Sequence, residues 1–212
     1  MHYLNNWCHI RHQKITKNGQ TIFEDEQADT GTFLLNAYKQ LAIDYPKFYK
    51  MDNLCKLAFL AAESLLDGTS LPALAPAEDL GIVLANHYSS LDTDIHYLET
   101  AQSFPSPSLF VYTLANVMVG EVCIRHKLKG ENTVFIFDNY EIPFLCGYID
   151  DLLAINAASA VIGGWVDVME NHYEAFLYLA SHLNTENSLF HDHKIIETLY
   201  GKPDTGFENP DH

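Results

Sequence analysis

The chain has 212 residues, of which 48% are hydrophobic and 19% are charged. This composition excludes a largely disordered protein and predicts one substantial packed core. Acidic residues outnumber basic residues by 28 to 12, which gives a net charge of −16. A charge of this sign repels nucleic acid and anionic membrane surfaces, so both classes of partner are excluded.

The four cysteines lie far apart in the sequence and form no C-x-x-C pair: Cys8, Cys55, Cys123 and Cys146. This spacing predicts reduced, packed thiols and favours a cytoplasmic protein. The first residues are not apolar enough for a signal peptide. The longest mostly apolar run, residues 152–166, contains Asn156 and a glycine pair, and it is too short to span a bilayer comfortably.

The first third of the chain predicts β-structure followed by two helices. Residues 3–11 are strand-like, and the Asn18–Gly19 pair between β-branched residues predicts a hairpin turn. Apolar residues recur at helical spacing within residues 29–46 and again within residues 51–68. Both predicted helices are amphipathic and should pack on a sheet.

Apolar runs without alternation mark the middle of the chain, at residues 80–86, 133–137 and 159–168. Such runs are typical of parallel strands covered on both faces. Residues 116–128 and 141–157 between them predict helices, so we expect a layered α/β fold with a mostly parallel mixed sheet covered by helices. The sequence becomes polar near residue 185, and we expect a domain over residues 1–184 and a loose tail over residues 185–212.

The predicted helix of residues 141–157 is apolar on nearly every side, which requires cover from more than one direction. It is either a central core helix or a face that another subunit covers. The polar turn before it stands where many α/β enzymes hold a nucleophile. Here the turn consists of Asp138, Asn139, Tyr140 and Glu141.

Four stretches together resemble the N-terminal half of the β-ketoacyl-acyl-carrier-protein synthases, of the thiolase-like superfamily. They are residues 45–66, 78–94, 106–133 and 159–167. The family's P-N-x-x-x-G-like segment is matched by "ANVMVG", with Ala115 in place of the proline. The positions that match the family are Asn116, Gly120, Gly130, Gly163 and Gly164. The resemblance implies a half-thiolase fold.

The sequence departs from this family at the catalytic residues. The family's nucleophilic cysteine lies about 25 residues before the glycine pair, and counting back from Gly164 reaches Asn139, where no cysteine stands. Cys146 lies about two turns into the helix, away from the helix end that would lower a thiol pKa. We expect the second half of the family, which supplies two catalytic histidines, to be absent. We assign no catalytic residue from the family pattern and no cofactor.

Other chemistry has weaker support in the sequence. The pairs His9/His12 and His191/His193 lack metal-site spacing, so we assign no metal. Ser90 lies near the carboxyl end of a predicted parallel strand, where ligands often bind. Glu141 suits either a general base or a charge that caps the helix, and the capping interpretation is favoured.

The leading hypothesis is a noncatalytic ketosynthase-like accessory protein of fatty-acid, polyketide or aryl-polyene-type biosynthesis. It would act as a homodimer, or as a heterodimer with a complete ketosynthase, through an interface edge at residues 132–137. The rival is an acyl-thioester enzyme that uses Glu141, Ser90 or His87. A third hypothesis is an acyl-carrier-protein-binding module that docks its partner on a basic group: Lys47, Lys50, Arg125 and Lys127.

Overall fold

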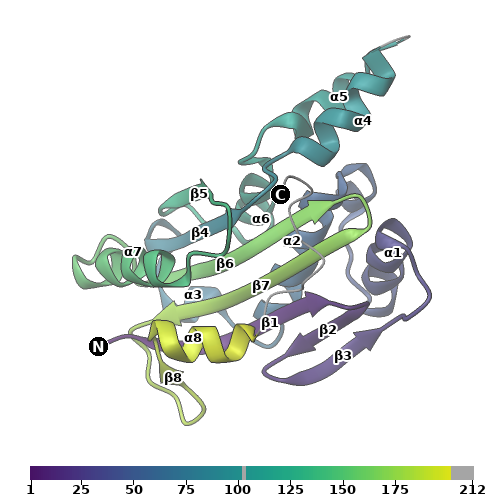
Figure 1. The fold of residues 1–212 in the computed structure, drawn as a ribbon. Helices are drawn as coiled ribbons and strands as arrows, with labels where there is room; N and C mark the ends of the chain where they lie inside the picture. Colours follow the sequence, from purple (N-terminus) through teal and green to yellow (C-terminus); the bar gives the residue numbers. More distant parts are fainter. Residues whose placement is uncertain (102–103, 202–212) are drawn as a thin grey trace.

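The computed structural model describes residues 1–101 and 104–201. Its centre is a mixed sheet in the order β3-β2-β1-β7-β6-β4-β5, with β8 paired to β1 beside this path (Figure 1). The strands are β1 (Tyr3–Arg11), β2 (Lys14–Lys17), β3 (Gln20–Glu24), β4 (Leu80–Asn86), β5 (Asn132–Ile136), β6 (Ala160–Met169), β7 (His172–Ser181) and β8 (Leu189–Phe190).

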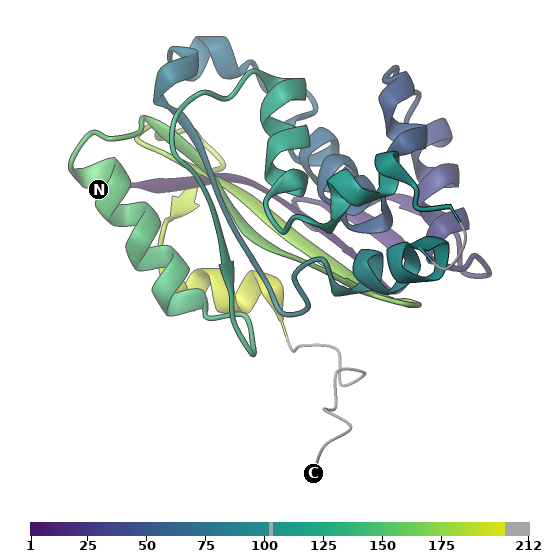
Figure 2. The same ribbon diagram turned by 90° about the horizontal axis from the view of Figure 1, so that it is seen from above.

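Helices cover both faces of this sheet, so the fold has three layers (Figure 2). One face carries α1, α2 and α6, and the other carries α7 and α8, while α4 and α5 project from one end of the sheet (Figure 1). The α-helices are α1 (Thr30–Gln40), α2 (Asn53–Leu66), α3 (Leu71–Leu74), α4 (Leu91–Ala101), α5 (Pro107–Phe110), α6 (Val117–His126), α7 (Ile142–Ala154) and α8 (His193–Tyr200). Short 3₁₀ turns are η1 (Pro46–Lys50), η2 (Ala77–Asp79) and η3 (Val111–Thr113).

The layered α/β fold with a mixed sheet is confirmed. The parallel pairs, however, are confined to β4 with β5 and β4 with β6. All other strand pairs of the described residues are antiparallel. The expectation of a mostly parallel sheet therefore holds only for the end of the sheet that is formed by β6, β4 and β5. The strand β7 was not predicted, because it follows β6 through a tight turn at Glu170 and Asn171 that carries no glycine.

The expected loose tail from residue 185 is wrong for its described part. Strand β8 pairs with β1, and α8 buries Ile196 and Tyr200 in the same apolar cluster as α7. The Asp192 carboxylate caps α8 by accepting hydrogen bonds from the backbone N–H groups of Lys194 and Ile195. Residues 202–212, the rest of the predicted tail, lie outside the described residues.

The core has two parts, one on each face of the sheet. Strand β4 is buried at every position, as the non-alternating sequence predicted, because helices lie on both of its faces. Helix α7 buries Leu145, Ile149 and Leu153 against the sheet, while Phe144 and Ile155 are 47% and 72% exposed. Only part of its apolar surface is therefore covered within this chain.

No single helix among the described residues has the length and apolar character needed to cross a membrane. The two helical stretches Pro107–Thr113 and Val117–His126 meet that test together, by length and composition only, and a 98° bend separates them.

The glycine pair of β6 marks a close approach between β6 and its neighbours. A Cβ atom at Gly164 would overlap the carbonyl oxygen of Phe176 on β7, and the backbone φ angle of +152° also disfavours a side chain. A Cβ atom at Gly163 would overlap Ile149 of α7 and would lie 2.7 Å from Tyr178 Cζ. The absence of side chains here lets α7 and β7 pack directly against β6.

The substitution Gly164→Ala should destabilise the protein by about 2–4 kcal/mol, because the new methyl group adds a steric overlap to a strained backbone. The matched control is Gly120→Ala within α6, where an added Cβ meets no atom within 4 Å. That change should stabilise the helix by about 0.5–1 kcal/mol. Urea unfolding curves of the three proteins measure both effects, and equal stability of the two variants would contradict the packing described here.

Candidate functional site

A pocket of about 500 Å³ opens at the carboxyl ends of the parallel strands. His87 and Tyr88, which follow β4, form one wall, and Trp165 and Asp167 of β6 form another. Tyr200, the last residue of α8, also lines the pocket. The carboxyl ends of parallel strands are where α/β proteins commonly bind ligands, so this pocket is the candidate site.

The predicted nucleophile-equivalent turn contributes Asp138, Asn139 and Tyr140 to the pocket lining. Glu141 is not among the lining residues; its side chain is exposed at the N-cap position of α7. This side chain makes no capping hydrogen bond, so the favoured interpretation of Glu141 as a helix cap lacks its expected contact. The turn thus reaches the pocket, but Glu141 does not line it.

Tyr140 packs the turn against the wall of the pocket. Its ring centroid lies 5.5 Å from that of Trp165 and 5.1 Å from that of Tyr200. The hydroxyl group is buried and has no hydrogen-bond partner among the described residues. Burial raises the pKa of Tyr140. Tyr140 therefore acts as a neutral packing residue that holds the turn in place.

The buried carboxylate of Asp167 holds the loop that carries His87. Its Oδ1 atom accepts hydrogen bonds from the backbone N–H groups of His87, at 3.2 Å, and Tyr88, at 3.0 Å. The Nδ1 atom of His87 lies 3.2 Å from the carbonyl oxygen of Phe137, next to the turn after β5. Burial raises the pKa of Asp167 despite the two amide donors. The loops after β4 and β5 are thereby joined.

A second buried carboxylate, Glu174 of β7, joins three elements beside the pocket. It contacts His9 Nε2 at 2.9 Å and accepts a hydrogen bond of 2.7 Å from the hydroxyl group of Tyr200. Burial alone would raise the pKa of Glu174, but His9 and Tyr200, together with Arg11, lower it. His9, which we considered with His12 for a metal site, is thus a hydrogen-bond partner of Glu174.

The remaining candidates for acid–base or nucleophilic chemistry lie away from the pocket. Ser90 is buried and donates a hydrogen bond of 2.9 Å to the carbonyl oxygen of Thr113. Of the three residues proposed for the rival enzyme, only His87 lines the pocket. The described lining residues include no cysteine, serine, threonine or lysine. The pocket can bind and orient a polar group, but it offers none of the usual nucleophiles for acyl transfer.

Cys146 does not line the pocket either. Its thiol is buried 3.8 Å from the ring nitrogen Nδ1 of His191. Burial, together with the negative charges of Asp150 and Asp192, raises the pKa of Cys146 to about 12. The group is therefore a neutral thiol at physiological pH, unlike the activated thiolate of a catalytic cysteine.

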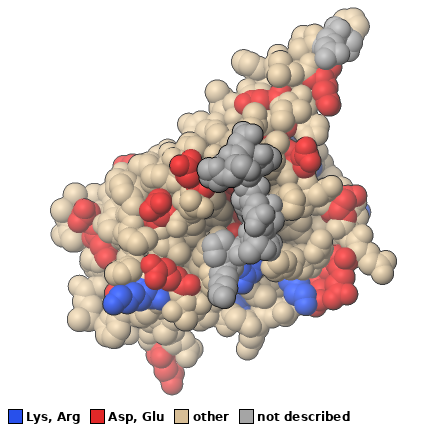
Figure 3. Space-filling model, in the orientation of Figure 1, with Lys and Arg blue, Asp and Glu red and all other residues tan. Residues whose placement is uncertain are grey.

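The basic residues predicted to dock a carrier protein are partly paired within the chain. Lys47 Nζ lies 2.7 Å from Glu121 Oε1, and Arg125 Nε lies 2.8 Å from Glu63 Oε1. Lys50 and Lys127 are exposed. On the face shown in Figure 3, acidic side chains are spread widely and basic ones are few. The docking role of this group stays a prediction.

Two further residues that match the family pattern, Gly130 and Asn116, lie outside the pocket. Gly130 lies so close to η2 and the start of β4 that an added Cβ would be 2.8 Å from the carbonyl oxygen of Leu80 and 2.9 Å from that of Glu78. Asn116 is the N-cap residue of α6, although its side chain makes no capping hydrogen bond. Neither residue reaches the pocket.

Several residues of the pocket were not found from the sequence, namely Trp165, Asp167, Glu174 and Tyr200. Asp167 lies within the predicted strand of residues 159–168, and a carboxylate in an apolar strand is a usable signal, because a buried charge requires partners. Glu174 and Tyr200 belong to elements that were not predicted.

The sequence matches no known protein-family model, and no curated protein matches it significantly. Solved structures do resemble the fold. The ishigamide ketosynthase/chain length factor has a TM-score of 0.65 and 18% identity, covering 85% of this chain and 62% of that chain. A ketosynthase in complex with its chain length factor, from Xenorhabdus doucetiae, has a TM-score of 0.54 and 17% identity, covering 84% and 79%.

A type II polyketide synthase acyl-carrier protein in complex with its ketosynthase bound to the hexaketide has a TM-score of 0.57 and 11% identity. The match covers 85% of this chain and 62% of that chain. This chain therefore spans less than two thirds of the length of two of the three structures. The expected similarity of fold to ketosynthases is confirmed, and identities this low establish similarity of fold alone.

The Glu63 ion pairs should make the protein sensitive to acid. Burial alone would raise the pKa of Glu63, but neighbouring His126 and Arg125 lower it from 4.5 to about 2. A carboxylate with a lowered pKa stabilises the folded state above pH 4.5, and this contribution disappears as the pH falls towards 2. Glu63→Gln should therefore lower the urea midpoint at neutral pH. The urea midpoint of this variant should also decrease less than that of the unmodified protein as the pH falls from 4.5 towards 2.

The matched control for this prediction is Glu78→Gln, because Glu78 pairs with Lys129 where both side chains are exposed. Surface pairs of this kind contribute little, so the control should follow the unmodified protein at every pH. An equal loss of stability for Glu63→Gln at neutral pH and at about pH 3 would show that the charge is not responsible.

Proposed function

We propose that this chain is a noncatalytic ketosynthase-like subunit that pairs with a complete ketosynthase in polyketide or aryl-polyene-type biosynthesis. The observation that carries the proposal is the turn between β5 and α7. It reaches the pocket with Asp138, Asn139 and Tyr140, and none of these side chains is a thiol or an aliphatic hydroxyl. Two of the structures with a similar fold are described as containing a chain length factor beside a ketosynthase.

The chemistry of the pocket favours a partner that supplies the catalytic nucleophile. Acyl transfer through a thioester needs an activated thiolate and donors for the oxyanion. The thiol of Cys146 is protonated and lies outside the pocket lining, and Asp167 and Glu174 are held by contacts within the fold. A pocket without a usual acyl-transfer nucleophile among its described lining residues is suited to binding a group rather than to transferring it.

The partner would bind along β5, the last strand of the sheet on this side. The N–H group of Phe137 donates to the carbonyl oxygen of Asn86 at the end of β4. Because backbone groups alternate in direction along a strand, the N–H group of the preceding residue, Ile136, points away from β4. No strand of the described residues pairs with this outer side, which leaves an edge that a partner strand can extend.

Aromatic side chains beside this edge provide an apolar contact surface. The ring of Phe144 lies 5.0 Å from that of Phe135 and 5.3 Å from that of Phe137. Tyr148 continues the group, with its ring 5.2 Å from that of Phe135. Phe144 and Ile136 are 47% and 49% exposed. A partner that covered them would gain apolar burial as well as backbone hydrogen bonds.

The other hypotheses have less support from the contacts. An enzyme that used Glu141 or Ser90 would need a residue that does not line the pocket. A carrier-protein-binding module would need Lys47 and Arg125, whose charges are already paired with Glu121 and Glu63. A homodimer through β5 would use the same edge and is the principal competitor.

The first test is recovery of the affinity-tagged protein from its own cells, followed by measurement of the native mass of the complex. A complete ketosynthase in equal amount is the expected result, because the noncatalytic chain needs a partner with a nucleophile. Recovery of only a homodimer or a monomer would contradict the proposed pairing.

The second test places a proline on the edge. Ile136→Pro removes an N–H group that points outward, so it should spare the β4–β5 ladder and reduce the recovered ketosynthase at least about tenfold. Ile22→Pro is the matched control at the opposite edge, because Ile22 falls at the irregularity in the β2–β3 pairing. Both variants should keep the circular dichroism spectrum of the unmodified protein. Undiminished pairing of folded Ile136→Pro would exclude β5 as the interface.

A further inference from the structure

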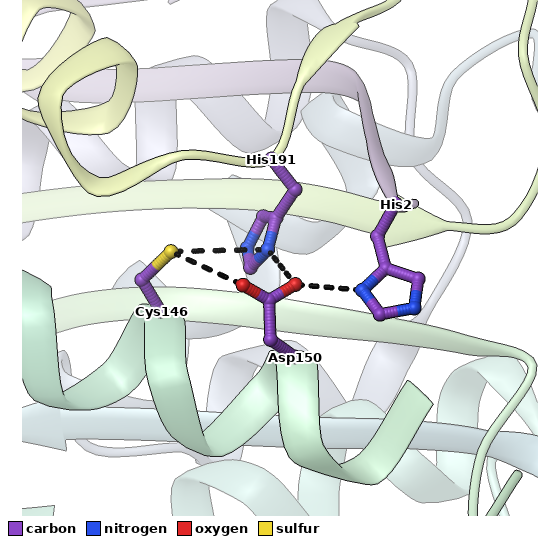
Figure 4. Close-up of polar contacts among 4 residues, drawn as sticks. All are labelled: His2, Cys146, Asp150 and His191. Carbon is purple, nitrogen blue, oxygen red and sulfur yellow. Dashed lines mark hydrogen bonds and ion pairs between the residues drawn. The ribbon is translucent and has the colours of Figure 1, made fainter. Parts of the chain in front are cut away.

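A sulfur atom, a carboxylate and an imidazole ring meet on the side of α7 that faces the end of β8 (Figure 4). Cys146 and Asp150 are one helical turn apart on α7, so their side chains lie on the same face. His191 comes from the segment that follows β8. We call these three residues the α7 cluster. Their potential ligand atoms all lie within 4.8 Å of one another.

The distances within the α7 cluster are compatible with one shared ion. The Nδ1 atom of His191 lies 2.9 Å from Asp150 Oδ1 and 3.8 Å from Cys146 Sγ, and the sulfur atom lies 3.9 Å from Asp150 Oδ2. In a tetrahedral zinc site the ligand atoms are separated by roughly 3.3–3.6 Å, given the usual zinc–ligand bond lengths. The His191–Asp150 contact is shorter than these separations and the two sulfur contacts are longer, and the two contacts of Asp150 use different oxygen atoms. Binding of an ion would therefore require small movements of these side chains.

His2 supports the α7 cluster from the opposite end of the chain. Its Nδ1 atom lies 2.7 Å from Asp150 Oδ1 (Figure 4). The backbone N–H group of His191 donates a hydrogen bond of 3.0 Å to the carbonyl oxygen of His2, next to the β1–β8 pairing. His2 therefore orients the carboxylate of Asp150 as an outer partner, which is how the ligands of metal sites are commonly held.

Burial gives the α7 cluster an enclosed side and an open side. The side chain of His191 is fully buried, and Cys146 is also buried. The side chain of Asp150 is 39% exposed, so an ion can enter from solvent past this carboxylate. A fourth ligand, if required, would be supplied by solvent on this exposed side.

The arrangement does not fit a catalytic triad. In such a triad the histidine uses one ring nitrogen for the nucleophile and the other for the acid. Here the same nitrogen, Nδ1 of His191, is the contact to both Cys146 and Asp150, while Nε2 has no hydrogen-bond partner among the described residues. None of the three residues lines the pocket. One nitrogen, one sulfur and one carboxylate oxygen that lie within 4.8 Å of one another form a candidate coordination site.

We propose that Cys146, Asp150 and His191 bind a zinc ion. A set of thiolate, imidazole and carboxylate ligands selects zinc over magnesium and calcium, which prefer oxygen ligands alone. On binding, the Cys146 thiol releases its proton to solvent and the sulfur–zinc bond forms. The ion joins α7 to the segment that leads into α8, and each of these two helices contributes a residue to the pocket lining, Ile142 and Tyr200.

The test uses the full chain with a tag that contains no histidine. After removal of metal with a chelator and dialysis against zinc, mass spectrometry of the metal content should find one zinc ion per chain. Replacement by cobalt should produce the charge-transfer absorption of a thiolate–cobalt bond. Zinc should also raise the melting temperature, because an ion that binds only the folded state stabilises it.

Matched variants distinguish the proposed zinc ligands from other residues of the same type. Cys146→Ser should abolish the cobalt–thiolate absorption, whereas Cys123→Ser, on α6, should keep it. His191→Gln should weaken zinc binding by more than about 100-fold, while His193→Gln, two residues later, should leave it unchanged. His2→Gln should fall between them, with a loss of roughly 10–100-fold, as expected for an outer partner.

Two results would overturn the zinc site. The first is the absence of both stoichiometric zinc and the cobalt–thiolate absorption in the folded, unmodified chain, which would leave the α7 cluster as hydrogen bonds alone. The second is retention of zinc by folded Cys146→Ser and His191→Gln at the affinity of the unmodified protein. The first result is measured on the unmodified chain, so the proposal can be overturned even if a variant does not fold.

Discussion

The close packing of β6 against α7 and β7 is the constraint on which the other features depend. At Gly163 and Gly164 the strand has no side chains, so Ile149 of α7 and Tyr178 of β7 come within contact of its backbone. This contact fixes the height of α7 above the sheet. The turn that begins α7 is thereby placed over the carboxyl ends of the parallel strands, where its residues close the pocket. A bulkier residue in β6 would displace the helix, and the pocket and the edge beside β5 would move with it.

Two buried carboxylates fix the walls of the pocket, and their different surroundings explain their different acidities. Among the described residues, Asp167 accepts hydrogen bonds only from two backbone amides, so burial dominates and its pKa is raised. Glu174 has His9, Tyr200 and the guanidinium group of Arg11 around it, so its pKa is lowered although burial opposes this. Both side chains join segments that are far apart in the sequence. Both oxygen atoms of Glu174 and one oxygen atom of Asp167 position the pocket walls, while Asp167 Oδ2 is buried and has no hydrogen-bond partner among the described residues.

The sequence predicted the elements whose pattern is local. Runs such as residues 80–86, with no polar interruption, identified buried strands, and the Asn18–Gly19 pair identified a hairpin. The strand β7 was missed because its turn lacks glycine, and α8 was missed because Ile196 and Tyr200 are its only buried residues. The α7 cluster could not be predicted, since it joins residues that are 45 positions apart, and His2 is 148 positions from Asp150. Pairing of a C-terminal strand with β1 brings them together, and no local pattern encodes that pairing.

Helix α7 resolves the question raised by its nearly all-apolar sequence. Three directions around the helix meet three different environments, because successive residues turn by about 100°. Leu145, Ile149 and Leu153 face the sheet, Phe144 and Tyr148 extend towards the aromatic edge beside β5, and Cys146 and Asp150 point to His191. The apolar sequence predicted either a central core helix or a face that another subunit covers. In the fold the helix buries one face, and its exposed aromatic face lies beside the unpaired strand. A partner on β5 would therefore cover the part of the helix that the described residues leave exposed, and the role of this helix as a subunit interface stays a prediction.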